Sequence, residues 1–439
     1  MVRKIQRRVA QHHLKTDTEI RGPVLQFDWP AIQIGIGSYE EGPTGLTIFR
    51  FPDSAVAAVD VRGGSPGTVN TDYLRLGYEE PSVDAVVFSG GSAYGEEAIT
   101  AVATGLKDDG AYSGDWDNVA LVAGAIIYDF FGRRLNEFYP DKRLAQAALH
   151  DLRPGLFPLG AQGAGRMAMQ SGFFGWGVHS GQGGAFRQLD DLKVAAFVVV
   201  NSSGAITGRD GRLVKFRNQS TGLPKASDLL ASLPESRFED WKPKVSSPSK
   251  TGGHHTTTSL VVTNHKLRYA ALQRLAVQVQ TSMARAIQPF STDVDGDTLF
   301  ALSTEEVSST SASLRDLNAI ASEVMWDAIL TSVPEEPIFV PSPPIDVSSA
   351  SLTKCAGSFR FGPKAVLDVR VHHDQLSAEP TMDFFDFRSG QSVNLQPISE
   401  SDFCVPGIHR TRVSFPRENP NIALINPGRW QQLGFRETK

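Results

Sequence analysis

Residues 256–264 have the sequence Thr-Thr-Thr-Ser-Leu-Val-Val-Thr-Asn and mark an abrupt change in the chain. They follow a polar segment, 209–255, which is rich in lysine, serine, proline and glycine and ends Lys-Thr-Gly-Gly-His-His. Such a segment buries little apolar surface, so we expect it to be exposed and mobile. The run Ser259–Thr263 instead predicts a buried strand. An exposed loop therefore ends at three hydroxyl side chains that lead into the core.

Helices and strands alternate on both sides of this strand. Downstream, apolar residues at helical spacing predict helices over 267–287 and 314–328, with a strand between them at Leu299–Ser303. Upstream, from residue 32 to about 208, glycine-rich turns separate short apolar runs that predict buried strands at Leu46–Phe51, Ala55–Val61, Ala85–Phe88 and Val194–Val200. Helices are predicted at Glu96–Leu106 and Leu144–Leu152. The fold class of this part is therefore α/β.

The composition divides the chain into four parts. Residues 1–30 are polar and predict a peripheral tail, whereas residues 31–332 carry the α/β pattern. A proline-rich linker is expected at 333–350. From 351 to 439 polar and apolar residues alternate as in strands, which predicts a separate small antiparallel barrel or sandwich.

The overall composition is that of an ordinary globular protein, with 439 residues, 41% hydrophobic and 21% charged. A single core stops growing at roughly 250–300 residues, so more than one domain is expected. The net charge of −5 gives no electrostatic reason to bind nucleic acid. No apolar run approaches the roughly 18–20 residues that span a bilayer, so we expect no membrane segment.

Cysteine use and the N-terminus bear on the compartment. The two cysteines, Cys355 and Cys404, fit a reducing compartment, and we expect a cytoplasmic protein. Residues 3–8 are basic but no hydrophobic segment follows them, which is unlike a secretory signal and leaves a mitochondrial presequence open.

A hydroxyl residue at the start of a buried strand suits one kind of chemistry. If the chain is cut before that residue, the freed α-amino group, with a pKa of about 7.7–8.0, can act as base for the side-chain oxygen of the same residue. Threonine runs before strands also arise from β propensity alone. Both interpretations stay open on this feature.

Two carboxylates, Asp295 and Asp297, flank Gly296 before the next strand. Carboxylates at i and i+2 can both face one site, where they hold an ammonium group and tune a proton transfer. A calcium loop is an alternative, but the glycine and the glutamate of an EF-hand are not in their places. An ordinary acidic turn is the third possibility.

Two further motifs give a weaker indication of a chemical role. Residues 89–95, Ser-Gly-Gly-Ser-Ala-Tyr-Gly, suggest a nucleophile elbow, but Tyr94 stands where that motif needs glycine. The glycines more plausibly allow close backbone approach, or binding of an oxyanion at the following helix N-terminus. The pair His254-His255 has no nearby acid or cysteine and indicates loop residues rather than a metal site.

Ordered blocks of the sequence resemble the L-aminopeptidase/D-esterase family, which includes β-aminopeptidases and nylon-oligomer hydrolases. The blocks run from Ile34 to about Ala328. They include Ala-Ala-Val-Asp-Val-Arg-Gly-Gly-Ser-Pro-Gly-Thr at 57–68, Asp-Ala-Val-Val-Phe-Ser-Gly-Gly-Ser-Ala-Tyr-Gly at 84–95, Val-Val-Asn-Ser-Ser-Gly at 199–204, the threonine strand at 256–264, and 284–304.

The resemblance implies an α/β/β/α sandwich of the self-processing N-terminal-nucleophile type. The nucleophile precedes a Val-Val-Ala-Thr-Asp/Asn strand end in the family, which places it at Thr256, or at Thr257 if the register slips by one. Cleavage between His255 and Thr256 would give chains of 255 and 184 residues. The family's other site residues map onto Asp295, Asp297, Asn201 and Tyr128.

These positions imply a complete hydrolytic mechanism without a metal or cofactor. The Thr256 hydroxyl would attack an amide or ester carbonyl while its α-amine carries the proton. Asn201 and Tyr128 would donate to the oxyanion, and the two aspartates would orient the amine. The resemblance further implies a peptide or small amide or ester substrate, and a homo-oligomer of processed αβ units.

The sequence departs from the family in three places. His255 stands where many members have Asn or Gly, and residues 179–184 lack the lysine of a common Lys-Gly-Gly segment. These changes keep open a non-catalytic binding or assembly module that retains the fold; an acyltransferase similar to ornithine acetyltransferase is a further alternative. The additional tail resembles, at 357–361, lipocalin-like barrels appended to some serine hydrolases, and could cover the active-site mouth or mediate assembly.

Overall fold

The computed structural model describes residues 14–75, 81–110, 112–116, 118–131, 138–174, 178–215, 222–231, 255–310, 312–333, 345–362, 364–382, 387–405, 411–426 and 431–437. Most of the expected exposed loop (216–221 and 232–254), most of the linker and the basic N-terminus lie outside these residues. The predictions made for those segments therefore stay predictions.

The described residues before the linker form a sheet of eleven strands. Its main path runs β12 (Gln182–Leu189), β13 (Leu192–Asn201), β15 (Thr256–His265), β17 (Thr298–Val307), β4 (Thr44–Val61), β6 (Ser82–Ser89), β7 (Val122–Ile126) and β5 (Thr68–Val69). Three more strands, β3 (Gln33–Tyr39), β1 (Thr16–Asp17) and β8 (Arg153–Pro154), extend it beyond β4. β15 and β17 are parallel, whereas β13–β15 and β17–β4 are antiparallel.

Strand β4 belongs to both halves of this sheet. Its first half, 44–50, pairs with β3 and β6, and its last residues, 56–61, pair with β17. The register with β6 shifts between Arg50 and Ala55, and Ser54 there has a positive φ of 59°. The two strands predicted at 46–51 and 55–61 are thus one irregular strand that joins the two halves of the sheet.

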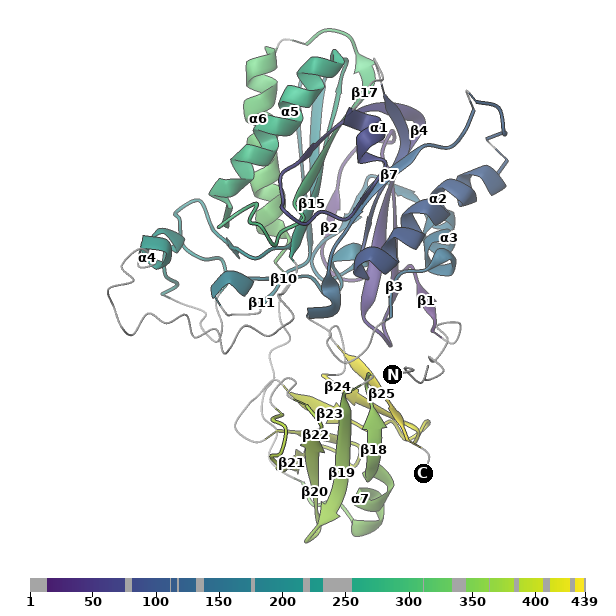
Figure 1. Ribbon diagram of the computed structural model, residues 1–439, viewed down its shortest axis with the longest axis vertical. Helices are drawn as coiled ribbons and strands as arrows, with labels where there is room; N and C mark the ends of the chain where they lie inside the picture. Colours follow the sequence, from purple (N-terminus) through teal and green to yellow (C-terminus); the bar gives the residue numbers. More distant parts are fainter. Residues whose placement is uncertain are drawn as a thin grey trace, which may run out of the picture.

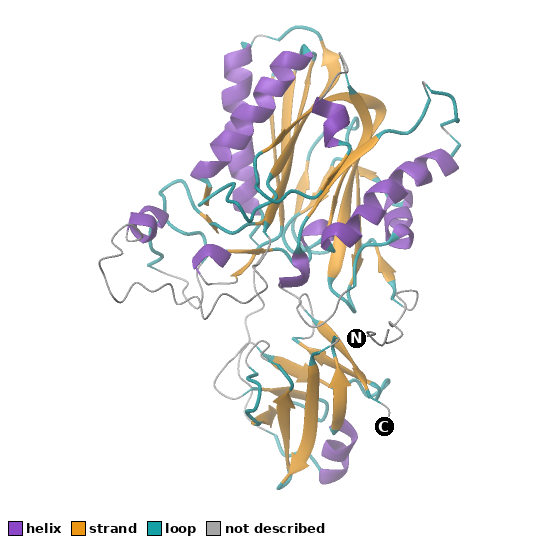
Figure 2. Ribbon diagram, in the orientation of Figure 1, coloured by secondary structure: helices purple, strands orange, loops and turns teal. Residues whose placement is uncertain are grey.

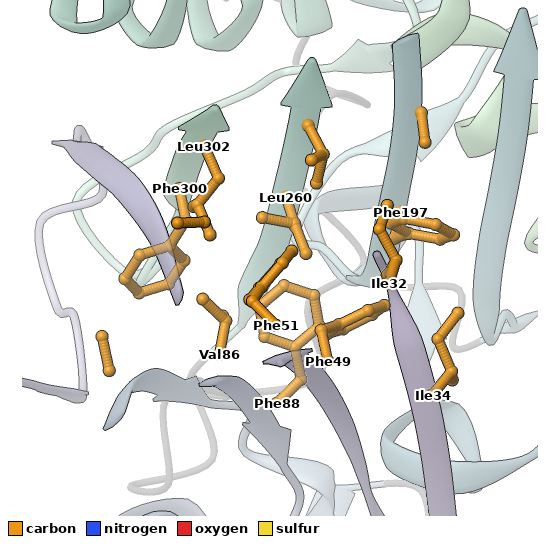
Figure 3. Close-up of a cluster of buried hydrophobic side chains, with 14 of the residues drawn as sticks. Ile32, Ile34, Phe49, Phe51, Val86, Phe88, Phe197, Leu260, Phe300 and Leu302 are labelled. Carbon is orange, nitrogen blue, oxygen red and sulfur yellow. The ribbon is translucent and has the colours of Figure 1, made fainter. Parts of the chain in front are cut away.

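Apolar side chains from the two halves face each other (Figure 3). Phe197, Leu260 and Phe300 come from one half, and Phe49 and Phe88 come from the other. Helices cover both outer faces (Figure 2). Helices α5 (Tyr269–Ser282) and α6 (Leu314–Thr331) pack on the β13–β15–β17 side, and α2 (Glu96–Asp108) and α3 (Lys142–His150) pack on the β6–β7 side. The α/β/β/α sandwich is therefore confirmed.

Shorter elements complete this part of the chain. The helices are α1 (Thr71–Arg75) and α4 (Ala226–Ala231), with 3-10 turns η2 (Ser92–Gly95), η3 (Asp129–Phe131), η4 (Gly163–Gly165), η5 (Gly172–Phe174) and η6 (Met283–Arg285). Three two-stranded pairs are β2 (Val24–Gln26) with β9 (Leu156–Pro158), β10 (Met169–Gln170) with β11 (Val178–His179), and β14 (Ala205–Ile206) with β16 (Ile287–Gln288).

The C-terminal part is a closed eight-stranded barrel, as the sequence predicted. Its strands are β18 (Gly357–Arg360), β19 (Val366–His372), β20 (Gln375–Pro380), β21 (Val393–Pro397), β22 (Asp402–Cys404), β23 (Arg412–Ser414), β24 (Ile422–Ile425) and β25 (Gln432–Arg436), preceded by α7 (Ser349–Cys355). Buried side chains such as Phe359, Phe403 and Ile425 form a core of its own. The barrel lies at one end of the longer domain (Figure 1) and contacts it where Gln431 donates to the Glu40 carbonyl at 3.0 Å.

Three side chains of the expected peripheral tail at 1–30 nevertheless reach the core. Leu14, Phe27 and Trp29 are buried. Phe27 and Trp29 belong to the apolar layer between the two halves of the sheet, and Leu14 belongs to the cluster beneath α2 and α3. The Trp29 indole also donates to the Glu306 carboxylate at 2.7 Å. The polar residues around these few large side chains hid their contribution to the core.

No described helix is long and apolar enough to cross a membrane.

Phe197 tests the central layer. Its ring centroid lies 4.8 Å from that of Phe157 and 5.0 Å from that of Phe49, and the side chain is fully buried. Replacing it by alanine should lower the free energy of unfolding by about 3–5 kcal/mol, because the loss of packing and the cavity add. Urea unfolding measures this, with Leu189→Ala, which is half exposed, as the control. A loss for Phe197→Ala no greater than the control's would contradict this placement.

Candidate active site

The proposed nucleophile Thr256 is the first residue of β15 and lies directly opposite Asn201, the last residue of β13. Thr256 is only 2% exposed. The strand ends that carry both residues point toward β10 and β11, on the side of the domain nearest the barrel (Figure 1). Antiparallel pairing thus brings together two polar residues that are 55 positions apart in the sequence.

The carbonyl of His255, just before Thr256, is held by two donors. The Thr256 hydroxyl oxygen Oγ1 donates to this carbonyl oxygen at 2.6 Å, and the Gly296 backbone N–H donates to it at 2.7 Å. The His255 N–H in turn donates to the Val294 carbonyl at 3.2 Å. The peptide group before Thr256 is therefore fixed against the 292–297 turn, with the hydroxyl beside its carbonyl.

Gly296 is a position where a side chain would not fit. A Cβ there would lie 2.7 Å from Thr256 Oγ1 and 2.8 Å from the Ser65 carbonyl oxygen. Residues 62–65 run along the same turn, and the Ser65 N–H donates to the Asp295 carbonyl at 2.8 Å. Glycine at 296 is therefore what allows the hydroxyl, the N–H and the 62–65 segment to meet.

Asp295 and Asp297 both turn inward, and backbone N–H groups hold them. Asp295 accepts from the Ser203 N–H at 3.0 Å and from the Thr292 N–H and hydroxyl at 3.0 and 2.5 Å. Asp297 accepts from the N–H groups of Thr257 and Ser291 at 2.6 and 2.9 Å. The pair therefore bonds to Ser203, just beyond β13, and to Thr257, next to Thr256 on β15.

Burial makes the Asp297 carboxyl hard to ionise. It is fully buried, and this burial, together with the charge of Asp295, raises its pKa to about 7, although the N–H groups of Thr257 and Ser291 oppose the shift. The Asp297 carboxyl therefore keeps its proton to a higher pH than an exposed aspartate does.

Asn201 and Tyr128 also meet at the site. The Asn201 side-chain nitrogen Nδ2 donates to the Tyr128 carbonyl at 3.1 Å, and its oxygen accepts from the Met169 N–H at 2.9 Å. These two bonds fix the orientation of the amide and occupy one of its two N–H groups. The expected phenol donor of Tyr128 stays a prediction, because the contact with Asn201 is made by the Tyr128 backbone.

Thr257, the alternative nucleophile, has a different role. Its N–H donates to Asp297, and its Cα lies opposite Val200 rather than Asn201. Because side chains alternate along a strand, its hydroxyl points to the opposite face from that of Thr256. The register thus favours Thr256.

Several groups at the site were not found from the sequence. They are the N–H of Gly296, the Ser203 N–H, and Gly172, where a Cβ would lie 2.4 Å from the His255 ring nitrogen Nε2. His179, next to Met169 across the β10–β11 pair, is another; burial and the charges of Lys215 and Arg166 lower its pKa to about 3. A backbone N–H group cannot be recognised from the residue type. The paired glycines at 63–64 do indicate that this segment approaches the backbone of residues 293–297 closely.

The described residues contain no group of three or more His, Cys, Asp or Glu side chains that could hold a metal ion. The loop suggested as a calcium site directs its two carboxylates at backbone N–H groups instead.

The site and fold together define a four-layer α/β/β/α protein whose sheet centre carries a hydroxyl, an amide and two carboxyls around one peptide carbonyl. A sequence profile of Peptidase family S58 matches residues 27–336, so the chain belongs to that family of peptidases. The resemblance inferred from the motifs is confirmed. Peptidases cleave amide bonds, and amide hydrolysis is the activity that this membership assigns to the chain.

Relatives share much of this domain. A 6-aminohexanoate-oligomer endohydrolase of Agromyces sp. (strain KY5R) is 40% identical over 320 residues, which cover 70% of this chain and 85% of the relative. An uncharacterized aminopeptidase of Mycobacterium leprae (strain TN) is 32% identical over 322 residues, covering 66% and 82%. A solved beta-aminopeptidase of Burkholderia sp. aligns with a TM-score of 0.48 and 17% identity, over 71% of this chain and 89% of that one.

The shifted carboxyl of Asp297 predicts how stability depends on pH. Its pKa rises from 3.8 unfolded to about 7 folded, so between these values the folded chain binds more protons and stability falls as pH rises. The test uses Thr256→Ala, which lacks the expected nucleophile and so should stay a single chain. We expect the free energy of unfolding of this variant to drop by a few kcal/mol from about pH 4 to pH 7. Adding Asp297→Asn should remove this part of the slope. Urea titrations at several pH values measure it, and equal slopes in both proteins would contradict the shift.

Proposed function

We propose that the protein is a self-cleaving N-terminal threonine hydrolase that cuts itself between His255 and Thr256 and then hydrolyses amide or ester bonds. The observation that carries this proposal is the His255 carbonyl oxygen, which accepts from both Thr256 Oγ1 and the Gly296 N–H. A nucleophile beside a carbonyl whose oxygen is already held by a backbone donor is the arrangement that acyl transfer needs.

Self-cleavage follows from these contacts. Thr256 Oγ1 attacks the His255 carbonyl carbon, and the Gly296 N–H holds the oxyanion that forms. The C–N bond breaks, the hydroxyl proton ends on the departing nitrogen, and an ester joins His255 to Thr256. Water then hydrolyses the ester, leaving a carboxyl group on His255 and a free amine and hydroxyl on Thr256.

The new amine becomes the base for turnover. It takes the proton from Thr256 Oγ1 during attack on a substrate carbonyl and returns it to the leaving amine. The Asp297 carboxyl accepts from the neighbouring Thr257 N–H, and because its pKa lies near 7 it ionises beside the protonated amine and balances the charge of that amine. The second N–H of Asn201 donates to the substrate oxyanion.

The substrates that we propose are peptides or small amide oligomers, with an aminopeptidase activity as the particular form. Relatives named as an oligomer endohydrolase and as an aminopeptidase support this range. We further propose a cytoplasmic enzyme that assembles as a homo-oligomer of processed units. Two unpaired cysteines support the compartment.

The two chains would stay together after the cut, because they share one sheet. β13 and β4 of the first chain flank β15 and β17 of the second. At the surface, the guanidinium groups of Arg209 and Arg285 each lie 4.7 Å from a ring centroid of Trp326, and both pair with Glu323. Within this cluster only Arg209 belongs to the first chain, so its contacts with Trp326 and Glu323 join the two chains.

Thr256→Ala tests the nucleophile. Without the hydroxyl the chain should remain one species of 439 residues, and amide hydrolysis should fall to background, whereas the wild type should give fragments of 255 and 184 residues. Intact mass spectrometry and N-terminal sequencing measure the first, and release of amine from a small amide measures the second. Thr257→Ala is the matched control.

An uncleaved and inactive wild type would refute the proposal and leave the non-catalytic module as the remaining interpretation. Fragments beginning at Thr257 would move the nucleophile by one residue.

Gly296→Ala tests the scissile carbonyl. The new Cβ would lie 2.7 Å from Thr256 Oγ1, so either the hydroxyl or the N–H must move away from the carbonyl. We expect the rate of self-cleavage to fall roughly 100-fold or more, in keeping with loss of an oxyanion donor. Gly114→Ala, where nothing lies within 4 Å, is the control. Cleavage of Gly296→Ala at the control's rate would remove Gly296 from the mechanism.

A further inference from the structure

The glycine-rich turn 89–95 is built to hold its shape, although the proposed chemistry gives it no part. The buried Asp129 carboxylate accepts from the Gly91 N–H at 2.9 Å and from the Thr44 hydroxyl at 2.6 Å. A Cβ on Gly95 would lie 1.8 Å from the Gly90 carbonyl oxygen, and Gly91 has a φ of +82°. The glycines thus let the turn fold tightly against Asp129.

This fixed turn exposes an aromatic side chain. Tyr94 is 55% exposed, although the turn that carries it is held in place. Its ring centroid lies 5.7 Å from that of Tyr139 and 6.4 Å from that of Phe130, and Phe130 lies 5.5 Å from Tyr128. The four rings form a row, which we name the aromatic strip.

The aromatic strip begins at the catalytic site. Tyr128 accepts from Asn201 through its carbonyl at 3.1 Å, and Asn201 lies opposite Thr256. From Tyr128 the contacts run through Phe130 to Tyr94, and from Tyr94 to Tyr139. The strip thus adjoins the proposed site through the Tyr128 backbone, and it offers aromatic surface to a substrate that extends past Tyr128.

We propose that the aromatic strip is the subsite for the apolar segments of an extended amide substrate, with Tyr94 as its most exposed ring. The inference rests on the proposed function and names the part of the substrate beyond the reacting bond. The rings carry no charge, and the carboxylate beneath the turn is buried and hydrogen-bonded. Glu96 and Glu97 directly follow the turn, so the outer end disfavours an acidic chain.

The test compares linear oligoamides with five-methylene spacers, from two to six units long, in wild type, Tyr94→Ala and Tyr94→Phe. In wild type KM should fall as the chain lengthens. In Tyr94→Ala the KM of the longest oligoamide should rise about three- to tenfold, with a smaller rise for the shorter ones, because one aromatic contact is lost. Tyr94→Phe should restore the wild-type values. Trp116→Ala, which removes an aromatic side chain that is 88% exposed elsewhere, is the control.

A KM in Tyr94→Ala that depends on chain length as in wild type would overturn the subsite. So would a change of assembly in Tyr94→Ala by light scattering, since that would place Tyr94 in a contact between subunits. Both results require a wild type that cleaves itself and hydrolyses amides. A wild type that does neither would refute the proposed function and the subsite together, and mass spectrometry separates that case from the others.

Discussion

The hydrogen bond from the Gly296 N–H to the His255 carbonyl is the contact about which the site is arranged. It joins the residue before β15 to the turn before β17, and so extends the pairing of these parallel strands beyond their ends. It also places Asp295 and Asp297 on either side of the joined position. A Cβ at 296 would break the arrangement, so a missing side chain, rather than an added group, is the constraint that the site depends on.

Local patterns were enough to predict most helices and strands. The helix predicted at 96–106 is α2, and that at 314–328 is α6, because both have apolar faces at helical spacing. The joining of two predicted strands into β4 was missed. It depends on a left-handed backbone conformation at Ser54, which a serine in the sequence does not indicate. Burial of Trp29 was missed for a related reason: its packing partners are far away in the sequence.

The site could be predicted only where side chains carry the chemistry. Asp295 and Asp297 stood out by their spacing, and their inward orientation fits that expectation. Asn201 and Tyr128 came from family resemblance alone, because nothing local indicates that β13 ends opposite Thr256. The donors on Gly296 and Ser203 belong to the backbone, and the ring contacts of Tyr94 depend on residues 36 and 45 positions away. These donors and ring contacts depend on the tertiary structure, so no local sequence pattern predicts them.

The contact between the barrel and the longer domain gains a meaning from the position of the proposed cut. The barrel would belong to the second chain, yet its Gln431 and Phe435 touch Glu40 and the apolar cluster around Leu14, which belong to the first. The shorter chain would then hold the longer one at two separate places, the sheet centre and the barrel contact. If one of the two contacts opens, the other still holds the chains together and keeps the opened surfaces at a high effective concentration. The two chains therefore separate only when both contacts are open at once. The appended barrel would thus be a second attachment between the two chains that the proposed cut produces.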